Sequence, residues 1–137
     1  MKKDNIDELK SLGSKKTDYL DTPSIDILET FPNQFAERNY EIKLEFHEFT
    51  SLCPKTGQPD FASIIVTYTP AERCLETKSL KLYFFSYRQQ GAFMETTINS
   101  IFSDLVQKSA PKKMEVKGIF NSRGGIQNIV TCSLDEG

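Results

Sequence analysis

An alternation of apolar and polar residues over residues 40–47 constrains the fold more than any other feature of the sequence. This period of two predicts a strand with one buried face and one solvated face. A second strand is predicted at residues 61–68, because this run is rich in β-branched side chains and Pro70 ends it. The segment at residues 51–60 is then predicted to be the loop that joins the two strands.

Two helices and two further strands are predicted after Pro70. Apolar residues recur at spacings of three and four over residues 80–87 and again over residues 98–105, which is the pattern of two amphipathic helices. A glycine separates these segments and a proline closes the second. Residues 114–120 and 126–133 are predicted to be strands that form a hairpin.

The resulting order, ββααββ, predicts an α+β fold in which a small antiparallel sheet of four strands carries two helices on one face. Such a sheet has two exposed edges, and exposed edges invite pairing with another chain, so we expect an oligomer. The polar residues 1–38 are predicted to form a partly extended N-terminal arm, and residues 39–137 a single domain. Five apolar residues are expected to anchor the arm: Ile25, Ile27, Leu28, Phe31 and Phe35.

Length and charge exclude several classes of protein. The 137 residues suffice for one domain with a sizeable core. The formal net charge of −2 provides no basic surface for a nucleic acid, so no such partner is expected. No apolar run approaches the roughly 18 residues of a membrane span, and the first residues lack the hydrophobic stretch of a secretory signal. We therefore expect a cytoplasmic protein without a membrane partner.

The cysteines and the histidine bear on metal and redox chemistry. The chain has three cysteines at wide spacing, which is neither a disulfide framework nor a zinc-binding pair, so three free thiols are expected. His47 is the one histidine, and a His-rich metal site is therefore ruled out. No metal is expected.

The stretch SLCPKTGQPDF contains a candidate nucleophile. Cys53 lies in a loop with proline and glycine rather than in an apolar run, and loops on rigid scaffolds often carry reactive groups. A thiolate attacks electrophilic carbon if its pKa is lowered or a base is near, and Asp60 is the candidate base if the loop folds back. A free cysteine is more often a small buried hydrophobic residue, so spacing alone leaves both interpretations open.

Two glutamates and several basic residues are candidates for binding. Glu76 and Glu95 are predicted at helix starts, where a carboxylate favours the helix dipole; a buried carboxylate there can also accept the N–H and amino edge of a purine-like base. Arg123 lies in the glycine-rich turn FNSRGG, which is either a solvated turn or a site for the phosphates of a cofactor. A Rossmann site is excluded, because no GxGxxG follows a strand.

Four stretches together resemble one family, the NADPH-dependent 7-cyano-7-deazaguanine reductases, often called QueF, in its single-module subfamily. They are FTSLCPKTGQPDFA, ETKSLKLYFFSYR, GAFMETTIN and FNSRGG, within residues 40–132. The stretch ETKSLKLYFFSYR is similar to the family signature Glu-Ser-Lys-Ser-x-x-Lys, with Thr77 where serine is usual. The resemblance implies a tunnelling fold, in which the sheets of neighbouring subunits join into a barrel ring. Two stacked rings would form a decamer with active sites between subunits.

The resemblance also implies an activity. The family reduces the nitrile of 7-cyano-7-deazaguanine to the amine of 7-aminomethyl-7-deazaguanine with two NADPH, on the path to the tRNA nucleoside queuosine. Cys53 would form a covalent thioimide with the nitrile carbon, and Asp60 would shuttle protons. The other implied roles are substrate binding by Glu76, Glu95 and Ser79, and cofactor binding by Lys78, Lys81 and Arg123.

One position departs from the family pattern. The family has a histidine immediately before its substrate-binding glutamate, where this chain has Met94, and methionine cannot titrate. Two alternatives stay open: an amidine-forming relative that adds ammonia to the same thioimide on tRNA, and a non-catalytic deazapurine-binding module. A zinc-dependent cyclohydrolase of the same fold is disfavoured, because one histidine cannot supply its ligands.

Overall fold

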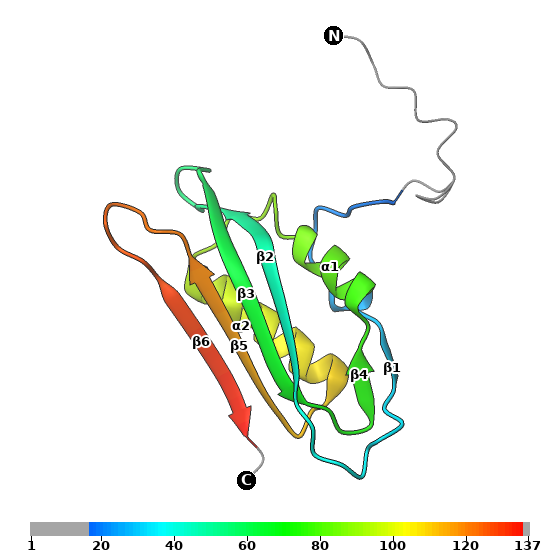
Figure 1. The fold of residues 1–137 in the computed structure, drawn as a ribbon. Helices are drawn as coiled ribbons and strands as arrows, with labels where there is room; N and C mark the ends of the chain where they lie inside the picture. The colour runs from blue at the N-terminus through cyan, green and yellow to red at the C-terminus, as the bar shows by residue number, and fades with distance from the viewer. Residues whose placement is uncertain (1–16, 136–137) are drawn as a thin grey trace, which may run out of the picture.

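A computed structural model describes residues 17–135 of the chain (Figure 1). The predicted ββααββ order is confirmed, with three short elements added. No helix in this part of the chain is long and apolar enough to cross a membrane. The elements are the 3-10 turn η1 (Ile25–Ile27), strands β1 (Thr30–Pro32), β2 (Ile42–Leu52), β3 (Pro59–Thr69), β4 (Arg73–Leu75), β5 (Lys113–Phe120) and β6 (Ile129–Asp135), and helices α1 (Thr77–Phe85) and α2 (Met94–Ser109).

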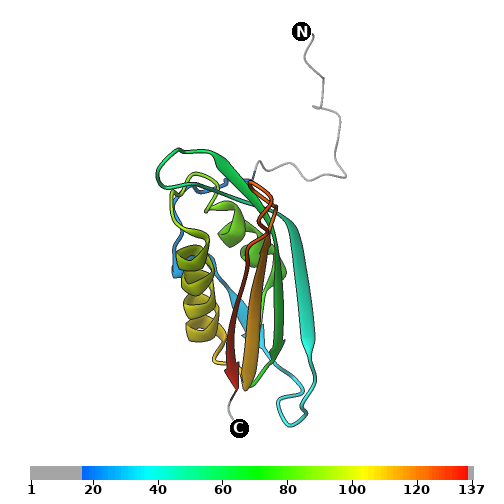
Figure 2. The same cartoon turned by 90° about the vertical axis from the view of Figure 1, so that its left-hand side faces the viewer.

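The main sheet has the order β2-β3-β5-β6, and all its neighbouring strands are antiparallel. Both helices cover the same face of this sheet, as Figure 2 shows. The prediction of an α+β fold with four antiparallel strands and two helices on one face is therefore confirmed. Strands β2 and β6 form the two edges, and each pairs with only one strand of the described chain.

The helical face of the sheet forms the core. Residues of β3 alternate in burial, and Ile64 and Val66 are fully buried beneath the helices. Helix α2 contributes Ile98, which packs on β5 at Gly118. A Cβ atom added at Gly118 would lie 2.4 Å from Cδ1 of Ile98, so the glycine allows the helix to approach the sheet closely.

Strand β2 is longer than predicted, and the joining loop is shorter. The alternation continues past residue 47 after a bulge between Phe46 and Phe49, which turns Phe49 into the core. A bulge inserts an extra residue and shifts the phase of the alternation, so the period-two pattern misses the second half of the strand. The connecting loop is reduced to residues 53–58, and Asp60 lies within β3.

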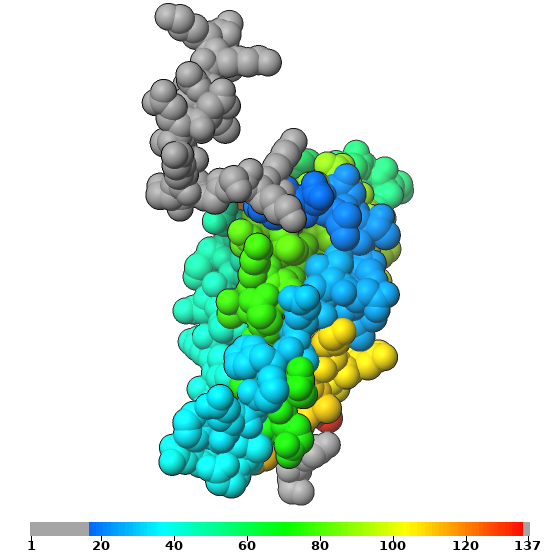
Figure 3. All heavy atoms as spheres, turned by 90° about the vertical axis from the view of Figure 1, so that its right-hand side faces the viewer, coloured from blue at the N-terminus to red at the C-terminus, as the bar shows by residue number. Residues whose placement is uncertain are grey.

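The segment before β2 contacts the helices through fewer anchors than predicted. Leu28 is buried, and Ile25 and Ile27 pack against the core. Phe31 and Phe35, in contrast, are about half exposed, and their predicted anchoring role is wrong. Strand β1 pairs with β4 in a separate two-stranded ribbon, so Phe31 does not enter the core. Figure 3 shows the blue residues of this segment beside the green residues of α1.

The arm and domain boundary at residue 38 remains a prediction, and residues 1–16 of the arm lie outside the described part. The start of the last strand is corrected, since β6 begins at Ile129 rather than at residue 126. Two glycines with positive φ, Gly124 and Gly125, form a tight turn between Arg123 and Ile126. The prediction included Ile126 because of its apolar side chain, but that side chain is 74% exposed.

Candidate functional site

Cys53 stands directly after β2 in a tight loop. Its backbone N–H donates to the carbonyl of Gln58 (2.8 Å), and its carbonyl accepts from the N–H of Gly57 (2.9 Å). Gly57 has a φ of 73°, which a side chain would disfavour. These bonds close the hairpin between β2 and β3 and fix the backbone of the candidate nucleophile.

The loop lowers the pKa of the Cys53 thiol from its ordinary value to about 7. The largest cause is a hydrogen bond from the hydroxyl of Thr56, followed by the backbone N–H groups of Thr56 and Lys55, while Arg123 makes a smaller contribution. Burial raises the pKa of Cys132, which makes that thiol less reactive. A thiol with a pKa near neutrality is a nucleophile at physiological pH, which favours the reactive interpretation of Cys53.

Asp60 lies beside this loop as a buried carboxylate. Its side chain is 4% exposed, and its Oδ1 accepts from Nη1 of Arg123 at 2.9 Å. The other arm of the guanidinium, Nη2, donates to Oε1 of Gln58 at 2.6 Å. A buried carboxylate requires such a partner, because an isolated buried charge is costly. The structure thus places Cys53, Asp60 and Arg123 at one end of the sheet.

The linker between the two helices holds the Cys53 loop from the other side. The N–H of Leu52 donates to the carbonyl of Gln90 (2.9 Å), and the N–H of Ala92 donates to the carbonyl of Leu52 (3.2 Å). Gly91 lies so close to the loop that an added Cβ would be 3.3 Å from Cα of Pro54. These contacts place the start of α2, and with it Glu95, at the same end of the sheet as Cys53.

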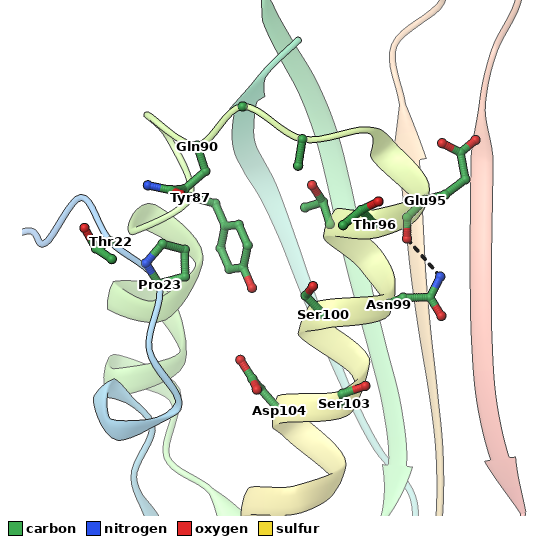
Figure 4. Close-up of a pocket in the computed structure, with 13 residues that line it drawn as sticks. Thr22, Pro23, Tyr87, Gln90, Glu95, Thr96, Asn99, Ser100, Ser103 and Asp104 are labelled. Carbon is green, nitrogen blue, oxygen red and sulfur yellow. Dashed lines mark hydrogen bonds between the residues drawn. The ribbon is translucent and has the colours of Figure 1, made fainter. Parts of the chain in front are cut away.

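Glu95 lies in the first turn of α2, as predicted, but its side chain is exposed rather than buried. Its Oε2 accepts from Nδ2 of Asn128 at 3.1 Å, and the same amide lies 3.3 Å from Sδ of Met94. Figure 4 shows the carboxylate pointing away from Thr22 and Pro23, while the Glu95 carbonyl accepts from the Asn99 side chain. One acceptor oxygen of Glu95 has no partner among the described residues.

An open hollow of about 840 Å³ lies between the start of α2, the helix linker and the segment at residues 22–23 (Figure 4). Tyr87 and Asp104 line its inner part and are joined through Tyr83, whose hydroxyl donates to Asp104 (2.6 Å) and bonds Tyr87 (2.9 Å). Thr97 also lines the hollow, and its buried hydroxyl has no hydrogen-bond partner within residues 17–135.

A second group of predicted site residues gathers at the start of α1. Glu76 is the N-cap of this helix, and its carboxylate accepts from the N–H groups of Lys78 (2.6 Å) and Ser79 (2.8 Å). Ser79 is buried; its hydroxyl donates to the Glu76 carbonyl and accepts from the N–H of Glu29. Lys78 and Lys81 are exposed. The start of α1 adjoins residues 43–46 of β2, whereas Cys53 follows the far end of that strand. Within one chain the two groups are therefore separate.

The sequence patterns did not predict a role for three residues at the Cys53 end of the sheet: Thr56, Gln58 and Asn128. Thr56 had a local signal, because its hydroxyl accepts from the N–H of Gln58 in a turn of the kind that threonine favours before glycine. Gln58 and Asn128 act through partners distant in sequence, and Asn128 was placed within a predicted strand. In residues 17–135 no cluster of three or more His, Cys, Asp or Glu side chains forms a metal site.

Together these features define an α+β protein that carries a low-pKa thiol and a buried, paired carboxylate at one end of an antiparallel sheet. A model of the family described as QueF-like protein matches residues 59–137. Curated relatives named NADPH-dependent 7-cyano-7-deazaguanine reductase match nearly the whole chain, and the chain belongs to this QueF family. The resemblance in the four sequence motifs is thereby confirmed.

Three of these relatives show the extent of the match. The reductase of Streptococcus thermophilus (strain ATCC BAA-491 / LMD-9) is 52% identical over 123 residues, which cover 90% of this chain and 76% of the relative. That of Nitratidesulfovibrio vulgaris (strain DP4) is 48% identical over 124 residues, covering 90% and 75%. That of Bacillus subtilis (strain 168) is 48% identical over 125 residues, covering 91% and 76%.

A solved structure shares the fold. The apo crystal structure of the archaeosine synthase QueF-Like superposes with a TM-score of 0.65 over 71% of this chain and 94% of that chain. The sequence identity is 20%, so this likeness bears on the fold alone.

Proposed function

We propose that this protein reduces the nitrile of 7-cyano-7-deazaguanine to the primary amine of 7-aminomethyl-7-deazaguanine with two NADPH, as a step of queuosine biosynthesis in the cytoplasm. The proposal rests chiefly on Cys53, a thiol with a pKa of about 7 at the same end of the sheet as the buried Asp60. It is supported by relatives about half identical that carry the name of this activity. We expect neither a nucleic acid nor a membrane to be a partner.

Cys53 and Asp60 together meet the demands of nitrile chemistry. A nitrile accepts reducing equivalents poorly, and addition of a thiolate turns it into an imine-like carbon that accepts them more readily. Sulfur bonds to the nitrile carbon as one carbon–nitrogen π bond breaks, and the electron pair moves to nitrogen. That nitrogen takes the proton that Asp60 removed from the thiol. The product is a thioimide on Cys53.

The chain offers cationic side chains to the cofactor. NADPH supplies the reducing equivalents for both reductions when it is bound. Lys78 and Lys81 are exposed on the first turns of α1, and their ammonium groups suit phosphates. Arg123 was predicted to join them, but its guanidinium is engaged with Asp60 at the other end of the sheet. We infer that Lys78 and Lys81 hold the phosphates.

The deazaguanine edge presents N–H and amino donors, for which carboxylate oxygens are the matching acceptors. Glu95 is the leading candidate, because it is exposed at the Cys53 end and one of its oxygens is unpartnered among the described residues. Glu76 keeps further acceptor capacity after capping α1. Ser79 remains a predicted neighbour of Glu76, and its hydroxyl already makes two internal hydrogen bonds.

Assembly of several chains is part of the proposal, because the two groups of site residues lie apart in a single chain. Strands β2 and β6 are edges that a neighbouring chain can pair. We propose that such pairing joins the sheets into a barrel ring, that two rings stack into a decamer, and that the Glu76 group of one subunit meets the Cys53 group of another. Native mass spectrometry tests this, and a monomer at working concentration contradicts it.

Met94 stands next to Glu95 where the family has a histidine. Its thioether sulfur contacts the amide of Asn128, and it cannot exchange protons in the physiological range. Proton transfer in this protein therefore falls to Asp60 and water.

The direct test combines two measurements on the purified protein with 7-cyano-7-deazaguanine. We expect loss of NADPH absorbance that depends on the nitrile, and an adduct on Cys53 seen by mass spectrometry of the intact protein when NADPH is omitted. An adduct that consumes ammonia without NADPH indicates the amidine-forming alternative. Tight binding without an adduct indicates the non-catalytic module, and either result contradicts the proposal.

A further inference from the structure

The guanidinium of Arg123 is built into the Cys53 end rather than left free in a solvated turn. The backbone of Arg123 exchanges two hydrogen bonds with Ile126, at 2.9 and 3.0 Å, across the turn formed by Gly124 and Gly125. The side chain is 36% exposed, so it is only partly solvated. The turn therefore projects the guanidinium from the β5–β6 connection onto the hairpin of β2 and β3.

The two arms of the guanidinium bond one member of the candidate catalytic pair and the loop that carries the other. One arm bonds the carboxylate of Asp60. The other bonds the side chain of Gln58, whose own carbonyl accepts from the N–H of Cys53. A planar fork that binds two acceptors at once fixes their relative position, which a flexible ammonium group does poorly.

We propose that Arg123 is a positioning residue for the nucleophile and its base, acting as the shared counter-ion of Asp60 and Cys53. Proton transfer from the thiol to Asp60 moves one negative charge from the carboxylate to the sulfur. Because Arg123 bonds Asp60 and the Gln58 side chain of the Cys53 loop, its positive charge stays beside the pair and the site keeps one cation and one anion throughout this transfer. The inference rests on the proposed function, since it concerns the same nucleophile.

The charges at the site also stay balanced while the thioimide forms. The thiolate forms the sulfur–carbon bond, the nitrogen receives the electron pair, and Asp60 returns the proton to that nitrogen. Asp60 is then a carboxylate again, paired with Arg123 as in the free protein. The step is redox-neutral and needs no further reactant. Arg123 contributes a minor lowering of the pKa of Cys53, behind the Thr56 hydroxyl and the loop N–H groups.

The test compares R123M with R38M, a matched Arg-to-Met change at a side chain that is 69% exposed and distant from the site. We expect R123M to form the Cys53 adduct about tenfold more slowly than wild type, the scale of losing a close opposite charge. The KM for NADPH should stay unchanged, and R123K should recover part of the rate. Normal adduct formation with a raised KM for NADPH would mean that Arg123 serves the cofactor phosphates only, and it overturns the proposal.

A second measurement needs neither substrate nor cofactor. The rate of Cys53 alkylation by iodoacetamide is followed against pH by peptide mass spectrometry, and in R123M its midpoint should rise by about half a unit, less than for a fully exposed close pair. If R123M does not fold, R123Q keeps a hydrogen-bond donor without the charge and should show the same rise. A wild-type alkylation midpoint in the folded variant overturns the proposal. A shifted midpoint in a protein that forms no nitrile adduct leaves the inference standing and refutes the proposed function instead.

Discussion

The two ends of the sheet hold the predicted site residues in different ways. At the Cys53 end, Arg123 bonds Asp60 and Gln58 across 63 and 65 positions of the sequence. At the start of α1, the Glu76 carboxylate bonds residues only two and three positions away. The first end is assembled from distant segments, and the second is a local helix cap that two backbone bonds to Glu29 also hold: the Glu29 N–H donates to the Ser79 hydroxyl, and the Glu76 N–H donates to the Glu29 carbonyl.

This difference distinguishes the residues that set the reactivity of the thiol from the residues that stabilise the fold. A local cap satisfies the free N–H groups of a helix and stabilises that helix in any chain. The assembled end leaves a thiol half-buried and a carboxylate paired, which adds reactivity rather than regular structure. We therefore expect changes at the Cys53 end to alter the reactivity of the thiol, and changes to the helix-capping hydrogen bonds at the α1 start to alter the free energy of unfolding.

The largest effect is expected for Cys53→Ser. Loss of the thiolate removes the covalent adduct, and turnover should fall by roughly three orders of magnitude or more, as for other enzymes that lose their nucleophile. NADPH oxidation and intact-protein mass spectrometry measure the two effects. Cys132→Ser is the matched control, because this thiol lies on β6, outside the Cys53 loop, and hydrogen-bonds Asn99. Retained turnover in C53S would show that the reaction does not use the Cys53 thiol as its nucleophile.

A smaller loss is expected for Asp60→Asn, which keeps the shape and the contact with Arg123 but cannot take up the thiol proton. Removal of a general acid–base typically lowers the rate by roughly 10²–10⁴, and we expect a value near the lower limit because water can replace the carboxylate in part. Single-turnover adduct formation is the measurement. The matched variant Asp135→Asn, at an exposed position of β6, should react at the wild-type rate. An equal loss in both variants would indicate general damage and not proton transfer.

The local patterns of the sequence correctly predict the two helices, the order of helices and strands along the chain, and the helix-start positions of Glu76 and Glu95. They do so because a helical period and a capping position are set within a few residues. The bulge at residues 46–49 is missed, since the extra residue shifts the phase of the alternation and the shift resembles the end of a strand. The family motifs, and not spacing, single out Asp60 as the partner of Cys53.

The side-chain contacts at the Cys53 end are the feature of the structure that is hardest to predict from the sequence. The role of Arg123 toward Asp60 depends on where the β5–β6 turn comes to lie against the β2–β3 hairpin, which is a property of sheet order. Asn128 likewise contacts Glu95 only because the last strand begins later than its apolar residues suggest. Such contacts follow from tertiary packing and are not encoded in any short segment.

About a fivefold effect is expected for Thr56→Val. The Thr56 hydroxyl is the largest cause of the lowered pKa of Cys53, and its removal should raise that pKa by about one unit. The thiolate is the deprotonated form, so the alkylation midpoint moves to higher pH and alkylation near pH 7 becomes about fivefold slower. Iodoacetamide labelling of Cys53 against pH measures the shift. Thr131→Val, exposed on β6, should leave the midpoint unchanged, and a normal midpoint in T56V would assign the lowered pKa to the backbone N–H groups alone.

Ser79→Ala, at the start of α1, is expected to lower the stability of the fold without changing the reactivity of Cys53. The Ser79 hydroxyl accepts from the Glu29 N–H and donates to the Glu76 carbonyl, so its removal leaves a partly buried N–H unpaired. We expect the free energy of unfolding in urea to fall by about 1–2 kcal/mol, against no more than about 0.5 kcal/mol for Ser133→Ala at an exposed position of β6. The pH profile of Cys53 alkylation should not move, because no described contact links Ser79 to the Cys53 loop. A shifted profile in S79A would mean that the two ends of the sheet are coupled, and the separation of chemistry from stability would fail.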